Sequence, residues 1–264
     1  MTPAPLRIVQ YTDLHLFGAA DGQLRGVPTL PGLEATLAAA ARRESRWDAI
    51  LLTGDLVQDD PGGYARVQEL FGASPSPVYC IPGNHDEVDE MRAALGAAPF
   101  QINGSALHGR WLFAMLDSYV PGKAGGRLSE AELHRLDALL AAHADRHALV
   151  CLHHHPVPMK SRWLDTVGLE NPDALFAVLD RHANVRVLLW GHVHQAWEGA
   201  RNGVRLLSTP STGAQFKPGS DGFAIDRRPP GYRWFRLHDD GRVETAVEWI
   251  DAGALAPRID SLAG

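Results

Sequence analysis

Five short apolar runs of this chain each end in Asp, Asn or His, and this regularity constrains the fold more than any other feature. The runs cover residues 6–12, 48–53, 77–81, 148–152 and 185–190. Their length and their Val, Ile and Leu content are typical of buried β-strands. The polar groups that follow them are Asp13 and His15, Asp55, Asn84 and His85, His154, and His192 and His194. Helical patterns separate most of the runs, so we expect an α/β domain with helices covering strand-rich sheets.

The remaining patterns place the other elements. Helices are expected over residues 33–43, 61–72, 87–95, 129–143 and 171–182, and further strands over 111–116, 232–237 and 242–250. Ser129 and Asn171 stand where helix N-caps are expected. Residues 197–208 are typical of a hairpin, and 213–231 of a long Gly- and Pro-rich loop. We therefore predict one domain over residues 1–250, followed by a tail at 251–264.

The composition excludes several classes of protein. Lys and Arg number 25 against 31 Asp and Glu, a net charge of 25 − 31 = −6, and no basic block occurs, which argues against a nucleic-acid or membrane partner. No apolar run approaches the roughly 18–20 residues of a membrane span, and we identify no signal peptide. The two cysteines, Cys80 and Cys151, lie in apolar runs, which predicts buried free thiols in a reducing compartment. We therefore expect a cytoplasmic protein.

The polar residues after the strands are expected to meet in one site. Strand ends converge on the ligand crevice of an α/β fold, and side chains two residues apart in extended chain point the same way. Asp13 would then face the site with His15, and His192 with His194. This mixture of nitrogen and oxygen donors without thiolate suits Fe, Mn or Zn. Each motif alone has an ordinary explanation as a turn or an exposed surface, but five in order, each after a strand, favour a metal site.

The order of these motifs is specific to one superfamily. The series D-x-H, G-D, G-N-H-D, H-x-P and G-H-x-H, from Asp13 to His194, resembles the calcineurin-like metallophosphoesterases. A further similarity, to the bacterial class III 3′,5′-cyclic-AMP phosphodiesterases, is carried by residues 24–29, 152–158 and 163–165, by Asn171 and by residues 210–216. The resemblance implies an α/β fold in the form of a four-layer αββα sandwich, with two mixed β-sheets flanked by helices.

The resemblance also implies two metal sites. They would be held by Asp13, His15 and His194, and by Asn84, His154 and His192, with Asp55 bridging. His154 is chosen from its histidine triplet because it forms H-x-P with Pro156. Two divalent ions are implied, Fe²⁺ and/or Mn²⁺, with Zn²⁺ also open. The catalytic residue would be His85, and the substrate would contact Asn84, His85 and His194.

The implied activity is hydrolysis of 3′,5′-cyclic AMP to 5′-AMP by a metal-bridging hydroxide. The alternatives are a phosphodiesterase for 2′,3′-cyclic nucleotides or glycerophosphodiesters, and a non-catalytic metal-binding interaction module. The partner would be a small-molecule phosphodiester, with no nucleic acid and no membrane, and a homodimer is left open. The protein-phosphatase branch is disfavoured because Gly54-Asp55 is not followed by its Asp-Arg pair. Either Asp59 or Asp86 could orient His85, and Trp163 could contact the base.

Overall fold

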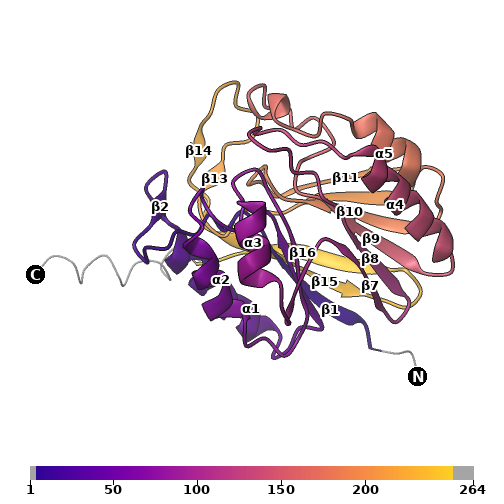
Figure 1. The fold of residues 1–264 in the computed structure, drawn as a ribbon, viewed down its shortest axis with the longest axis horizontal. Helices are drawn as coiled ribbons and strands as arrows, with labels where there is room; N and C mark the ends of the chain where they lie inside the picture. The colour runs from indigo at the N-terminus through magenta and orange to yellow at the C-terminus, as the bar shows by residue number, and fades with distance from the viewer. Residues whose placement is uncertain (1–3, 252–264) are drawn as a thin grey trace, which may run out of the picture.

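Two six-stranded β-sheets lie face to face in the computed structural model, which describes residues 4–251 (Figure 1). The first has the order β16-β15-β1-β4-β5-β6, and its strands are β1 (Leu6–Tyr11), β4 (Ala49–Thr53), β5 (Val78–Ile81), β6 (Phe100–Ile102), β15 (Gly231–Leu237) and β16 (Val243–Trp249). The second has the order β11-β12-β10-β9-β8-β7, and its strands are β7 (Gly104–His108), β8 (Trp111–Met115), β9 (His147–Cys151), β10 (Val185–Trp190), β11 (Trp197–Arg201) and β12 (Val204–Ser208).

Both sheets are mixed, with a parallel centre. In the first sheet β1, β4, β5 and β6 are parallel, β15 pairs antiparallel with β1, and β16 pairs antiparallel with the outer side of β15. In the second sheet β8, β9, β10 and β12 are parallel, and β7 and β11 form antiparallel edges. The carboxyl ends of parallel strands share one edge of a sheet. The loops after β1, β4 and β5 therefore all leave the first sheet at the same edge. The loops after β9 and β10 likewise leave the second sheet at one edge.

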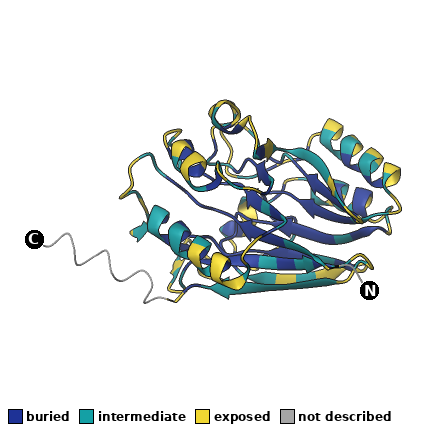
Figure 2. Ribbon diagram, turned by 90° about the horizontal axis from the view of Figure 1, so that it is seen from below, coloured by how far each residue is buried: buried dark blue, intermediate teal, exposed yellow. Residues whose placement is uncertain are grey.

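Helices cover the outer faces of the sheets. The first sheet is covered by α1 (Thr29–Arg43), α2 (Gly63–Phe71) and α3 (Val88–Leu95), and the second by α4 (Glu130–Ala142) and α5 (Pro172–Leu179) (Figure 1). Three apolar cores result, one under each helical layer and one between the sheets, where Phe113, Leu189 and Phe235 pack. The buried residues are concentrated along these inner strands (Figure 2). The expected αββα sandwich of two mixed sheets is confirmed.

Several local expectations are confirmed and others need correction. Ser129 caps α4 by accepting a hydrogen bond from the backbone N of Glu132 at 3.1 Å. The expected hairpin forms from β11 and β12, but the helix that follows Asn171 ends at Leu179 rather than at about His182. The segment expected as a continuous loop contains a short antiparallel pair, β13 (Gln215–Phe216) and β14 (Ile225–Asp226). A similar pair, β2 (Gln23–Leu24) and β3 (Val27–Pro28), precedes α1.

Two expectations concern the ends of the chain and the membrane. The predicted tail at 251–264 lies outside the described residues, apart from Asp251. Among residues 4–251, none of the helices has both the length and the apolar character that a membrane crossing requires.

Candidate metal centre

The predicted donors stand on loops that leave both sheets at the same end of the sandwich. Hydrogen bonds between backbones tie these loops together: Asp13 N donates to Gly54 O at 3.0 Å, and His15 N donates to Asp55 O at 2.9 Å. A side chain joins the two sheets, because both carboxylate oxygens of Asp13 accept from His192 N, at 2.9 and 3.0 Å. The site is thus assembled by backbone contacts as well as by the donors themselves.

The donor loops are not extended, and this corrects one step of the sequence reasoning. Positive φ angles occur at Asp13 (54°), His15 (45°), Asp55 (51°), His192 (66°) and His194 (48°). Residues other than glycine occupy this left-handed region at a cost in energy, and such strain is concentrated at functional sites. The side chains therefore converge through alternating left-handed residues rather than through the pleat of a strand.

The first group of donors contains two carboxylates and two imidazoles. The donor atoms of Asp13, His15, Asp55 and His194 all lie within 4.8 Å of one another, and all four residues are buried. Nδ1 of His194 donates to the carbonyl of Ala214 at 2.7 Å, so in the neutral ring Nε2 keeps its lone pair. This Nε2 lies 3.0 Å from Nε2 of His15 and 3.4 Å from Asp13. Two carboxylates and two converging ring nitrogens make a set of donors suited to a cation.

The second group is made of histidines from the second sheet. It contains His153, His154 and His192, which are all buried. Nδ1 of His154 is hydrogen-bonded to Ser118 Oγ at 2.9 Å, which fixes the orientation of the ring. Within residues 4–251, the buried Nε2 atoms of His154 and His192 and the buried Oδ1 of Asn84 have no hydrogen-bond partner. Buried polar atoms are rarely left unpaired, and a metal ion is what these three donors fit.

Burial sets the protonation of the donor rings. It lowers the pKa of His15 to about 3, although the charge of Asp55 acts in the opposite direction. It also lowers the pKa values of His154 and His192 well below the ordinary value. These three rings are therefore neutral over the usual pH range, which is the form of histidine that binds metal.

His153 differs from the neighbouring histidines. Its Nδ1 donates to Thr53 O at 2.8 Å, and its Nε2 lies 3.4 Å from Asp55. Burial lowers the pKa of His153, but the charge of Asp55 and the hydrogen bond to it outweigh burial and raise the pKa to about 9. A protonated ring has no lone pair to offer a metal. The geometry and the charge of Asp55 thus make His153 a cationic partner of that carboxylate.

His85 lies beside the donor groups and is partly exposed. Its ring meets that of His15 edge to face, with centroids 5.3 Å apart. Its Nδ1 lies 3.0 Å from both carboxylate oxygens of Asp59, so of the two candidates Asp59 is the residue that orients it. Asp86 is buried and accepts instead from Gly83 N, Leu56 N and the Tyr64 hydroxyl, which joins the two loops that carry Asp55 and Asn84.

A cavity of about 230 Å³ opens over these residues. His15, Asp55, Asn84, His85, His192 and His194 line one side of it, and Leu24, Arg25, Ala124, Trp163, Leu164, Val167, Phe216 and Phe223 line the other. The sequence drew attention to Trp163 but did not single out Phe223, which lies in an irregular loop. Ser118 was also missed, although it follows β8 as the donors follow their strands.

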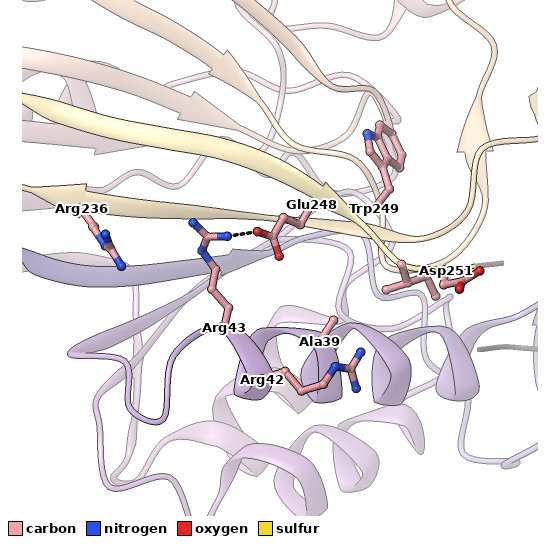
Figure 3. A pocket seen from close by; sticks show the side chains of 8 residues that line it. Ala39, Arg42, Arg43, Arg236, Glu248, Trp249 and Asp251 are labelled. Atoms are coloured by element: carbon pink, nitrogen blue, oxygen red, sulfur yellow. Dashed lines mark hydrogen bonds and ion pairs between the residues drawn. The ribbon is translucent and has the colours of Figure 1, made fainter. Parts of the chain in front are cut away.

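A larger hollow lies elsewhere on the molecule. It has a volume of about 560 Å³ and lies between α1 and the strands β15 and β16 (Figure 3). Arg43 is paired there with Glu248, and Arg236 is paired with Glu44 at 2.6 Å. None of the predicted site residues lines this hollow, and its charges are largely compensated.

The fold and the two adjoining donor groups are those of a hydrolase built around a pair of divalent metal ions. The family model of the calcineurin-like phosphoesterases matches residues 6–196, and the chain belongs to that family. The resemblance seen in the order of the motifs is thereby confirmed.

Curated relatives cover nearly the whole chain. A protein of Pseudomonas aeruginosa named 3′,5′-cyclic adenosine monophosphate phosphodiesterase CpdA is 41% identical over 95% of this chain and 92% of its own length. The protein of the same name from Escherichia coli K12 is 40% identical over 92% of this chain and 90% of its own length. Among solved structures, a dimetal phosphatase from Danio rerio superposes with a TM-score of 0.65 at 16% identity, covering 94% of this chain and 100% of that one. This last likeness concerns the fold alone.

Proposed function

We propose that this chain hydrolyses 3′,5′-cyclic AMP to 5′-AMP. The observation that carries the proposal is a small cavity in which members of both donor groups, His85 and the aromatic side chains of Trp163, Phe216 and Phe223 come together. Its volume of about 230 Å³ fits a small diester better than a polymer, so neither nucleic acid nor a membrane is part of the proposal. The names of the CpdA relatives support cyclic AMP as the diester. The cytoplasmic location stays a prediction, with which the two buried free thiols agree.

The proposed metal ligands are those implied by the motifs. Asp13, His15 and His194 would hold one divalent ion, Asn84, His154 and His192 the other, and Asp55 would be shared. Asp55 suits the shared role because it lies 3.7 Å from His15 of the first site and accepts at 2.9 Å from the backbone N of His85, the residue that follows Asn84 of the second. Fe²⁺ and Mn²⁺ are the proposed ions, with Zn²⁺ as the alternative, because the donors are nitrogen and oxygen.

Two divalent ions, when bound, supply an activated water and positive charge for the phosphoryl oxygens. The protein's own donors preserve that charge, because only two of them, Asp13 and Asp55, are carboxylates and Asn84 is neutral. Asn84, His85 and His194 are the proposed substrate contacts. All three line the cavity, so a phosphate placed against the donors would lie within reach of them.

His85 is proposed to assist the leaving group. Opening the ring of cyclic AMP expels the ribose 3′-oxygen, a poor leaving group that needs a proton or a hydrogen bond as the P–O bond breaks. The His85 imidazole stands at the cavity beside His15, and Asp59 holds its Nδ1, so its other nitrogen is free to serve that oxygen. Help of this kind is typically worth about 10²–10⁴-fold in rate.

The test compares two substrates in a His85→Ala variant. Bis(p-nitrophenyl) phosphate releases a nitrophenolate that needs no proton, so its hydrolysis should persist while cyclic-AMP hydrolysis falls by about 10²-fold or more. Metal content measured by mass spectrometry should be unchanged. Equal losses on both substrates would assign His85 to holding a phosphoryl oxygen, and loss of metal would make it a ligand.

The shared role of Asp55 is tested by metal analysis. Asp55→Ala should lose both ions and all turnover, whereas Asn84→Ala should chiefly weaken one site. Two tightly held ions in the Asp55→Ala protein would exclude sharing. A panel of 2′,3′-cyclic nucleotides and glycerophosphodiesters, assayed beside cyclic AMP with added Mn²⁺ or Fe²⁺, tests the alternative diesters. No hydrolysis of any diester by metal-loaded protein would favour the interaction module.

A further inference from the structure

Three aromatic side chains form one wall of the cavity. Trp163, Phe216 and Phe223 contact one another edge to face, with ring centroids 5.2, 5.1 and 5.3 Å apart. They come from two distant parts of the chain, the loop after β9 and the segment around β13 and β14. We call this cluster the aromatic wall. Its geometry is the one aromatic rings favour, so the cluster is a defined surface rather than a chance gathering of apolar groups.

The aromatic wall adjoins the donors at one end and solvent at the other. The ring of Phe216 stacks on that of His194, with centroids 3.8 Å apart and an interplanar angle of 8°. Phe223 is 45% exposed, although large apolar residues are usually covered. The guanidinium of Arg25 lies over it, 4.9 Å from the ring centroid. A molecule that reaches the donors therefore has an aromatic surface beside it.

The segment that carries Phe223 is held in place. Ser161 Oγ donates to Ser220 O at 2.6 Å, and Arg162 pairs with Asp221 at 3.0 Å. These contacts tie the segment to the loop that carries Trp163. The indole Nε1 of Trp163 is buried and has no acceptor among residues 4–251, which leaves one donor unused in the wall. An exposed ring on an anchored segment beside an unused donor fits a ligand that is both flat and able to accept hydrogen bonds.

On the basis of the proposed function, we propose that the aromatic wall binds the nucleobase of the substrate while the donor groups hold its phosphate. A purine has two faces for stacking and ring nitrogens that accept hydrogen bonds. Stacking of a base on an aromatic side chain adds to the affinity for the ligand. The wall then acts on the affinity for the substrate, and it takes no part in breaking the P–O bond.

The test separates base binding from phosphate binding. In a Phe223→Ala variant, we expect inhibition by 5′-AMP to weaken about 10-fold, and inhibition by ribose 5-phosphate, which has no base, to be unchanged. The reporter reaction is hydrolysis of methyl p-nitrophenyl phosphate, whose rate should stay near that of the unchanged protein. Phe223→Tyr should restore 5′-AMP binding. Leu107→Ala is the matched control, because Leu107 is also exposed, at 48%, but lies on β7 outside the cavity.

Each outcome decides one question. Equal weakening of 5′-AMP and ribose 5-phosphate would overturn the base site and make Phe223 a support for the donors. An unchanged inhibition constant for 5′-AMP would overturn it as well. If the unchanged protein binds 5′-AMP more tightly than ribose 5-phosphate through Phe223 but does not hydrolyse cyclic AMP, the base site stands and the proposed function fails. If cyclic AMP is hydrolysed and Phe223→Ala changes nothing, the function stands and the base site fails.

Discussion

The carboxylate of Asp59 is the residue-scale feature that shapes the behaviour of His85. Its side chain is 62% exposed, so it contributes little to the fold, and both of its oxygens face His85 Nδ1. Gln58 Nε2 donates to Asp59 at 2.8 Å and steadies it. A group of this kind acts by orienting its neighbour, and removing one costs about 10–100-fold in comparable sites.

We predict that Asp59→Ala lowers kcat for cyclic AMP by about 10-fold or more but changes hydrolysis of bis(p-nitrophenyl) phosphate little. Only the first reaction needs the oriented imidazole. Asp59→Glu should recover part of the loss because it restores a carboxylate. Steady-state kinetics on both substrates measures the difference, and an equal loss on each would show that Asp59 supports the site in general.

The two cysteines are buried in different cores. Cys151 lies between the two sheets, and Cys80 lies under the helices that cover the first sheet. Cys80 and Cys151 are fully buried, and burial raises the pKa of both thiols. Because the thiolate is the reactive form, the native protein should not react with Ellman's reagent at about pH 8, and both thiols should react in concentrated guanidinium chloride. The absorbance of the released thionitrobenzoate measures this. Rapid labelling of the native protein would contradict the packing described for β5 and β9.

The positions of the donors could be predicted from the sequence, but their immediate surroundings could not. Each donor follows an apolar run, and the fold turns that local signal into a shared site. The raised pKa of His153 depends on Asp55, which lies 98 positions away in the chain, and the contact of Phe216 with His194 depends on the path of an irregular loop. Such long-range pairings leave no local pattern.

At the scale of elements, a buried arginine joins the two sheets. Arg233 on β15 is fully buried, and it donates to Ser208 O of β12 at 3.0 Å and to Glu198 of β11 at 2.8 Å. A buried charge is tolerated only when it is paired and hydrogen-bonded. Strands β11 and β12 of the second sheet are thereby attached to the first sheet.

This contact predicts a dependence of stability on pH. Burial raises the pKa of Glu198, but the hydrogen bond from Arg233 and its charge outweigh burial and lower the pKa below the ordinary value. The stability that Glu198 contributes is therefore present above its unfolded pKa and is lost as the pH falls through the folded one. In urea unfolding at about pH 7 and about pH 3.5, Glu198→Gln should be destabilised at the higher pH and approach the unchanged protein at the lower. Glu90→Gln on the exposed face of α3 is the control, and a pH-independent difference would exclude the ion pair as the cause.

The strands with the plainest signal in the sequence are those buried on both faces. β1, β4, β5, β9 and β10 read as continuous apolar runs because each lies between a helical layer and the opposite sheet. Phe100–Ile102 and Gly104–His108 were not predicted, because they lie at the sheet edges and their residues are mostly not buried. The two-residue strands β13 and β14 are too short to give a periodic signal.

At the scale of the whole molecule, the proposed metal ions would join the two sheets. Asp13, Asp55 and Asn84 follow strands of the first sheet, and His154 and His192 follow strands of the second. Chelation should therefore lower Tm, because a ligand at a thousandfold excess over its Kd stabilises the native state by about 4 kcal/mol.

Hydrogen exchange locates this effect. After treatment with a chelator, exchange should quicken most in the loops after β5, β9 and β10 and least in the distant strands β7 and β16. Re-addition of Mn²⁺ should reverse the change. A uniform rise across both sheets would mean that the ions stabilise the whole fold and do not specifically join its two halves.

The left-handed backbone of the donor loops has a consequence for how this chain can change by mutation. Five of the proposed ligands have positive φ angles, which glycine adopts at a lower cost in energy. Among residues 4–251, several ligands also have buried polar atoms without a hydrogen-bond partner when no metal is present. In a library sorted only for abundance of folded protein in metal-depleted cells, replacements at His15 and His192 should be enriched, whereas sorting for turnover should remove every one of them. The substitutions tolerated in the two sorted libraries should differ at these few positions and agree across the three cores. A lineage released from the need for catalysis would thus lose its ligands first and its architecture last.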